Sequence, residues 1–75
     1  MENLRAESEK LRALLRGYKL TNLWMVEQLS LRGVTISSDG FSNALRLRTQ
    51  GDFTAKVIKL SLEILDEYAR KYLSP

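Results

Sequence analysis

Cysteine and histidine are both absent from this chain of 75 residues, and its single proline is Pro75. Without cysteine there is no disulfide and no thiol nucleophile, and without histidine the commonest general base is missing. Zinc sites built from these two residue types are excluded for the same reason. We therefore expect no enzyme activity, no metal and no cofactor. The lack of an internal proline permits helix along the whole chain.

Long apolar runs are missing as well. The longest is residues 23–26, Leu-Trp-Met-Val, whereas a bilayer requires about 20 apolar residues in a helix. Residues 1–5 do not begin the basic and then apolar pattern of a signal peptide. With 44% hydrophobic residues, the composition is that of a globular protein. We expect one soluble intracellular domain over residues 1–75, with no membrane partner.

The charge is small in sum but unevenly distributed. Twelve basic and nine acidic residues give a net charge of +3. Residues 10–59 contain nine basic and three acidic residues, so this middle carries +6 while the two ends together carry −3. A basic middle of this kind can bind the phosphates of a nucleic acid by releasing counterions. The alternative is a solvated surface with scattered positive charge.

Apolar spacing and glycine positions predict an all-α fold, a small bundle of four or five helices with a long C-terminal helix. The first helix is expected over residues 3–17, ending at Gly17. Thr21 is expected to cap a second helix over residues 22–32, which ends at a left-handed Gly33. The last helix is expected over residues 53–73, with Asp52 as its N-cap.

Residues 34–48 allow two interpretations. In the first, Ser37, Ser38 or Asp39 caps a third helix over about residues 38–47, because Phe41, Ala44 and Leu45 have the i, i+3, i+4 spacing of a buried helical face. In the second, residues 39–40 turn a hairpin and residues 45–48 form a strand, as in the wing of excisionase-type proteins. We favour the helix.

A third helix would complete a helix-turn-helix between Thr21 and Leu47. Its outward side would then present Asp39, Ser42, Asn43 and Arg46. Arginine pairs with guanine and asparagine with adenine in the major groove of DNA. Contacts to the DNA backbone are expected from basic and polar residues nearby. These are Arg32, Arg48, Thr49, Gln50 and Lys56.

The chain resembles the lambda-repressor-like (Xre-type) helix-turn-helix regulators of phages and mobile elements. The resemblance rests on residues 20–29 (LTNLWMVEQL), 33–35 (GVT) and 42–45 (SNAL), with a helix before and after them. It differs in a connection from Gly33 to Phe41 that is about two residues longer than the family's pattern, and in Leu29, where the family has a small residue.

The resemblance implies a sequence-specific regulator, most simply a repressor, that binds double-stranded DNA as a homodimer in the bacterial cytoplasm or nucleoid. By the same resemblance, the residues that read bases are Ser38, Asp39, Ser42, Asn43 and Arg46. The alternatives are a recombination accessory factor, or a helical protein-interaction module that captures a protein partner through Trp24, Met25 and the last helix.

The last helix is apolar over nearly twice the arc that a surface helix needs. One explanation is burial on two sides within a bundle. The other is a homodimer interface on one of the two apolar arcs. The residues of that arc are Ile58, Leu62, Leu65, Ala69 and Tyr72.

Overall fold

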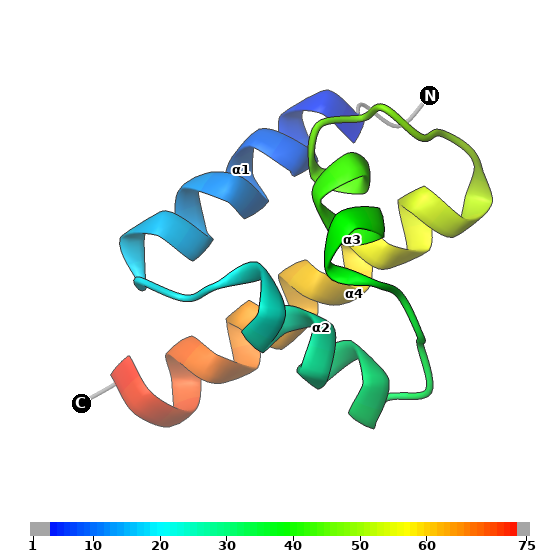
Figure 1. The fold of residues 1–75 in the computed structure, drawn as a ribbon. Coiled ribbons are helices and arrows are strands. Elements are labelled where there is room, and N and C mark those ends of the chain that lie inside the picture. Colours follow the sequence, from blue (N-terminus) through cyan, green and yellow to red (C-terminus); the bar gives the residue numbers. More distant parts are fainter. Residues whose placement is uncertain (1–3, 74–75) are drawn as a thin grey trace.

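The computed structural model describes residues 4–73, and these residues form an all-α fold (Figure 1). The helices are α1 (Leu4–Gly17), α2 (Asn22–Leu31), α3 (Ser38–Leu45) and α4 (Asp52–Tyr68), and a π-helical turn, η1 (Ala69–Leu73), continues α4. The predicted fold class is therefore confirmed. Residue 3, which was also expected in the first helix, lies outside the described residues. Within residues 4–73, no helix combines the length and apolar character needed to cross a membrane.

Helices α1 and α4 run in the same general direction, and α2 and α3 pack across them (Figure 1). Each helix contributes an apolar side to one core. Its fully buried large side chains are Leu11, Met25, Leu29, Phe41, Val57, Ile58 and Leu65. The buried face predicted for α3, made of Phe41, Ala44 and Leu45, is confirmed.

Two helix starts follow the predicted capping chemistry. The Oγ1 of Thr21 accepts a hydrogen bond of 3.0 Å from the backbone N–H of Trp24, and the Oγ of Ser37 accepts one of 2.9 Å from that of Gly40. The N-cap predicted for α4 was wrong by one residue, because Gly51 occupies the N-cap position and Asp52 is the first helical residue. A carboxylate in that first turn still complements the positive end of the helix dipole.

Helices α1, α2 and α3 end with the same two backbone hydrogen bonds. The N–H of a left-handed residue donates to a carbonyl three positions earlier, and the next N–H donates to a carbonyl five positions earlier. Gly33 has φ of 84° after α2, as predicted, and the N–H of Val34 donates to the carbonyl of Leu29. After α1 and α3 the left-handed residues are not glycines. They are Lys19, with φ of 59°, and Leu47, with φ of 56°.

The hairpin interpretation of residues 34–48 was wrong, because Ser38–Leu45 is helical and no described residue in this segment is in a strand. The helix ends two residues before the predicted position 47, since Arg46 is its C-cap. Gly40 lies in the first turn of α3, at a position where a side chain would be crowded. A Cβ on Gly40 would lie 3.1 Å from both Ile36 Cγ1 and the capping oxygen of Ser37.

Both apolar arcs of α4 are used within the chain. Ile58 and Leu65 are 0% and 1% exposed, so these two members of the predicted homodimer interface are wrong: they belong to the core of one copy. Leu62 and Ala69 are half-buried, and only Tyr72 is largely exposed, at 62%. Burial on two sides of the bundle therefore explains most of the wide apolar arc.

Candidate nucleic-acid interface

Helix α3 presents a polar side to solvent, opposite its buried apolar side. The hydroxyl of Ser38, the carboxylate of Asp39 and the guanidinium of Arg46 belong to exposed residues, and Ser42 and Asn43 are half-buried. All five predicted base-reading residues thus remain accessible on one short helix and its C-cap. Helix α2 packs against α3, which gives the expected helix-turn-helix pairing.

A shallow groove of about 260 Å³ runs between α3, α1 and the start of α2. We call it the basic groove. Leu15, Leu20 and Leu45 contribute its apolar lining. Its polar lining consists of Arg12, Arg16, Asn22, Ser42 and Arg46.

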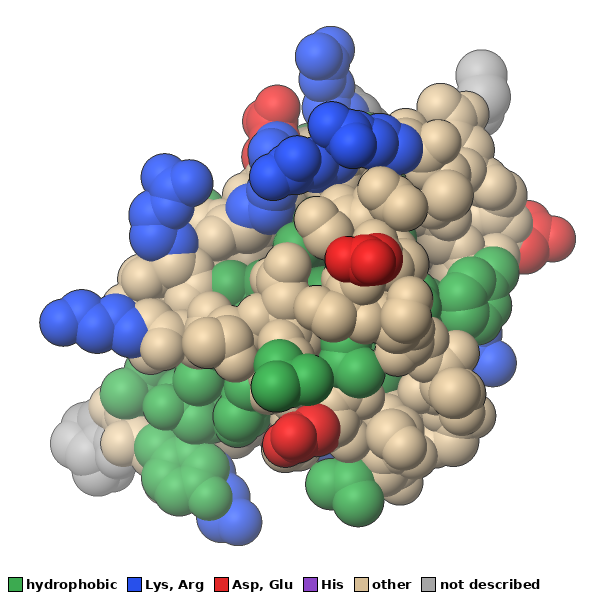
Figure 2. Space-filling view, in the orientation of Figure 1, with side chains coloured by type: hydrophobic (Ala, Val, Ile, Leu, Met, Phe, Trp, Pro, Cys, Tyr) green, Lys and Arg blue, Asp and Glu red, His purple; other side chains and the backbone are tan. Residues whose placement is uncertain are grey.

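Three guanidinium groups therefore line one groove, and none of the described residues that line it is acidic. Arg12 and Arg16 lie one helical turn apart on α1, where like charges cost a few tenths of a kcal/mol of helix stability. Figure 2 shows Lys and Arg side chains gathered at the top of this view, over α1 and the end of α3, with one acidic side chain among them and another below them. A strip of this kind attracts a polyanion that carries several phosphate groups in a row.

A buried hydrogen bond joins the two walls of the basic groove. Ser8 of α1 is 1% exposed, and its Oγ donates to the carbonyl of Leu45 over 2.7 Å. Leu45 is the last residue of α3, where carbonyls have no partner within the helix. The bond therefore fixes the C-terminal end of α3, and with it Arg46, against α1.

The residues predicted to contact the DNA backbone are distributed over more than one surface. Arg48, Thr49 and Gln50 are exposed in the connection that follows α3, close in sequence to Arg46. The Thr49 hydroxyl lies 3.1 Å from that of Thr54, which orders the chain before α4. Lys56 is exposed on α4 and does not line the basic groove.

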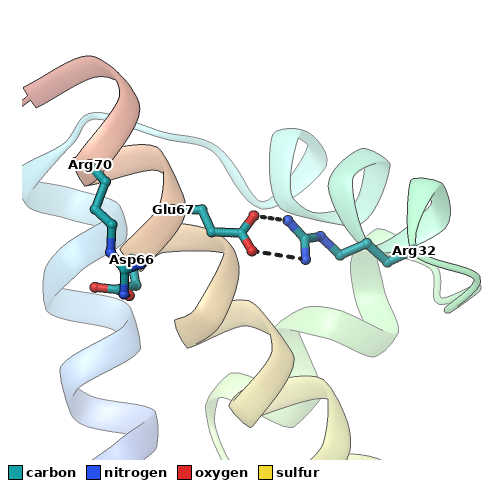
Figure 3. Close-up of polar contacts among 4 residues, drawn as sticks. All are labelled: Arg32, Asp66, Glu67 and Arg70. Atoms are coloured by element: carbon teal, nitrogen blue, oxygen red, sulfur yellow. Dashed lines mark hydrogen bonds and ion pairs between the residues drawn. The ribbon is translucent and has the colours of Figure 1, made fainter.

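Arg32, which was also predicted to contact the DNA backbone, does not line the basic groove. Its guanidinium forms hydrogen bonds with both carboxylate oxygens of Glu67 on α4, as Figure 3 shows. The hydrogen bond from Arg32 lowers the pKa of Glu67 below its usual value, and the same bond raises the pKa of Arg32. Arg32 is thus engaged within the chain, on a different surface from the basic groove.

That surface contains a groove of about 590 Å³ between α2 and the end of α4. We call it the aromatic groove. Its lining includes Trp24, Arg32, Glu67, Tyr68, Lys71 and Tyr72. The ring of Tyr68 contacts three other aromatic rings, with its centroid 5.5 Å from that of Trp24, 5.6 Å from that of Tyr18 and 5.0 Å from that of Tyr72.

The two residues proposed as protein-binding anchors have different environments. Met25 is fully buried in the core and is not available to a partner. Trp24 is half-buried and packs edge-on against Tyr68, at an interplanar angle of 78°. The anchor prediction is therefore wrong for Met25, while Trp24 remains partly accessible within the aromatic groove.

The sequence prediction did not include Arg12, Arg16 or Asn22 among the site residues. Their signal was present: the two arginines share one helical face at i, i+4, within the basic middle of the chain. No local pattern revealed the pairing of Arg32 with Glu67, which lie 35 positions apart. Comparisons of the chain with protein-family models, with curated proteins and with solved structures find no match.

Proposed function

We propose that this protein binds double-stranded DNA through α3 and the basic groove, as a sequence-specific regulator of the helix-turn-helix kind. The observation that carries the proposal is the convergence of Arg12, Arg16 and Arg46 on one groove beside the polar side of α3. Arginines at the edges of a helix hold phosphates, while the helix between them reaches base edges.

In this arrangement each group has a distinct role. Arg46, Asn43 and Ser42 face the major groove, where Arg46 pairs with guanine and Asn43 with adenine. Asp39 is repelled by phosphates, so it suits only a base edge with a donor, such as the N4 amino group of cytosine. Arg12, Arg16 and the backbone amides at the start of α2 near Asn22 hold the phosphates of one strand.

The experiment is selection of bound sequences from a random DNA library, followed by anisotropy titrations of the enriched site. Arg46→Ala is expected to weaken binding by about 1–3 kcal/mol and to relax the preference at one base pair. Arg16→Ala is expected to weaken all sequences about equally, because a contact to phosphate carries no sequence information.

Arg70→Ala is the matched control, since Arg70 is an exposed arginine paired with Asp66 on a different surface. It should leave the enriched sequence and its affinity unchanged. Absence of any enrichment, together with absence of binding to mixed DNA at low salt, would refute the proposal. Enrichment that survives unchanged in Arg46→Ala would remove α3 as the reading element.

A further inference from the structure

Helix α2 turns apolar side chains to solvent as well as to the core. Six of its ten residues are apolar, and they surround the helix. Met25 and Leu29 are fully buried, whereas Leu31 is 80% exposed and Leu23 is 58% exposed. A helix that is apolar on all sides is ordinarily buried on all sides. The outer side of α2 is therefore expected to meet a second surface.

The two exposed leucines belong to one row along α2. At about 100° per residue, Leu23, Glu27 and Leu31 lie within about 80° of one another, on the side opposite Met25 and Leu29. We call these three residues the α2 row. Figure 2 shows an acidic side chain between hydrophobic ones in the lower middle of the view, over α2. A single exposed leucine is ordinary, but two on one row form a continuous apolar surface.

The form of the α2 row indicates what packs on it. Residues spaced by four along a helix form a ridge, and such ridges pack into the grooves on the surface of another helix. From its first to its last residue the row rises about 12 Å, slightly more than two turns. A partner helix of ordinary length spans that distance.

The charge of the row narrows the choice of partner. Glu27 is the only charged residue of α2, and it forms no ion pair with any described residue. Arg32, at the C-cap of α2, is already held by Glu67. A nucleic acid or an anionic membrane would be repelled by the carboxylate of Glu27 and would find no cation in the row. A partner with positive charge is favoured instead.

We infer that the α2 row binds an amphipathic helix of another protein, whose contacting face carries a Lys or Arg between two apolar side chains. The apolar side chains cover Leu23 and Leu31, and the cation pairs with Glu27. Apolar burial supplies the affinity, while the ion pair between the apolar contacts selects the partner by its charge. The inference goes beyond the proposed function, since no residue of the α2 row lines the basic groove.

The test is selection from a displayed library of alanine-rich helices of about 18 residues, because shorter isolated helices are marginal in water. One face of each helix is randomised, and the full-length wild type is the bait. Selected peptides are expected to carry a Lys or Arg with an apolar residue one helical turn away on either side. Anisotropy titrations of the most enriched peptide then give its affinity for wild type and for each variant.

Two variants remove the apolar part of the row. Leu31→Ser should weaken the peptide by about 10-fold or more, which is the loss expected at an interface hot spot. Leu23→Ser is the second variant, and circular dichroism should show unchanged helix content in both because the two positions are exposed. Phe53→Ser is the matched control: Phe53 is 53% exposed on α4, outside the row, and its replacement should leave peptide binding unchanged.

Glu27→Lys tests the charge of the row. It should weaken the selected peptide by about 10-fold or more, because it brings two like charges together within the contact. The same peptide with its cation replaced by Glu should bind Glu27→Lys more tightly than it binds wild type. Reversal of the preference by changes in both partners shows that the two residues are in contact.

Failure to enrich any peptide with this pattern would overturn the inference, as would a preference for cationic peptides that Glu27→Lys leaves unchanged. Peptides weakened by Tyr72→Ser but not by Leu31→Ser would bind the aromatic groove, which also overturns it. Self-association of wild type that Leu31→Ser abolishes would place a second copy on the row instead. Leu31→Ser should not alter binding to a DNA half-site, the part of the enriched sequence that one copy contacts. Failure of the α2 row and failure of DNA binding are therefore distinguishable.

Discussion

The basic groove and the aromatic groove differ in how the chain satisfies its charged groups. In the basic groove, Arg12, Arg16 and Arg46 converge, and none of the described residues in its lining is acidic. In the aromatic groove, Arg32 is held by both carboxylate oxygens of Glu67. Positive charge that converges without a partner indicates a ligand of opposite charge, whereas positive charge that is already neutralised contributes to structure. The total of +3 does not distinguish these two uses of arginine.

The largest effect is expected from removing the charge of the basic groove. Each phosphate contact contributes about 0.9 to the slope of log K against log salt, so the double variant Arg12→Ala/Arg16→Ala should lower that slope by about 1.8. When the double variant and wild type are referred to equal affinity at 1 M salt, this difference in slope makes the double variant bind roughly 60-fold more weakly than wild type at 0.1 M. Anisotropy titrations of a half-site over a range of salt concentrations would measure it.

The double variant Lys10→Ala/Arg70→Ala makes the same change in net charge elsewhere. Lys10 lines a hollow between α1 and α4, and Arg70 pairs with Asp66 beside it. This control should leave the salt slope almost unchanged. Equal losses in the two double variants would mean that net charge, and not the basic groove, governs binding.

A smaller effect is expected from the bond that joins the walls of the basic groove. Ser8→Ala removes the donor to the carbonyl of Leu45 and leaves a buried acceptor unsatisfied, which costs about 1–2 kcal/mol of unfolding free energy. Urea denaturation would measure this loss, and half-site affinity should fall with it as Arg46 becomes less fixed. Ala13→Ser is the control, because it adds a hydroxyl on the exposed side of the same helix. Unchanged stability in Ser8→Ala would contradict the conclusion that this hydrogen bond holds the end of α3 against α1.

The smallest effect is expected in the aromatic groove, from Glu67→Gln. Because the pKa of Glu67 is lowered by Arg32, the stabilisation by this pair is present above the ordinary glutamate pKa of about 4.3. It is lost as the pH falls through the lower pKa of the folded state. The stability difference between wild type and variant should therefore be constant near neutral pH and disappear in acid.

Urea denaturation at a series of pH values would reveal that disappearance. Glu27→Gln serves as the control, because it makes the same substitution at an exposed residue of α2 and leaves the pairing of Arg32 with Glu67 in place. Neither variant should alter the salt dependence of half-site binding, because Arg32 lies outside the basic groove. A steeper slope in Glu67→Gln would show that freeing Arg32 creates a new phosphate contact.

Local patterns predicted much of the fold because the determinants were local. The caps at Thr21 and Ser37, the turn at Gly33 and the buried face of α3 all depend on residues within one or two helical turns. The interface predicted on α4 was wrong for two of its five residues, Ile58 and Leu65, since periodicity shows that they are apolar but not which surface covers them.

The candidate site was predictable in part for the same reason. The polar side of α3 follows from its own spacing, so its four outward residues, Asp39, Ser42, Asn43 and Arg46, were identified correctly as exposed or half-buried. The contribution of α1 depends on how α1 packs against α3, whose nearest ends, residues 17 and 38, are 21 positions apart, and no local pattern contains this packing. The engagement of Arg32 by Glu67 has the same origin, 35 positions apart.

The left-handed residues after α1 and α3 have a consequence for fragments of the chain. A left-handed conformation costs a residue other than glycine about 1–2 kcal/mol, so neither Lys19 nor Leu47 adopts it by its own preference. Leu47 packs against the core, and such tertiary contacts hold the turn. We therefore expect that an isolated peptide containing α3 would not stop its helix at Leu47. The boundary after α3 depends on contacts that exist only in the assembled fold.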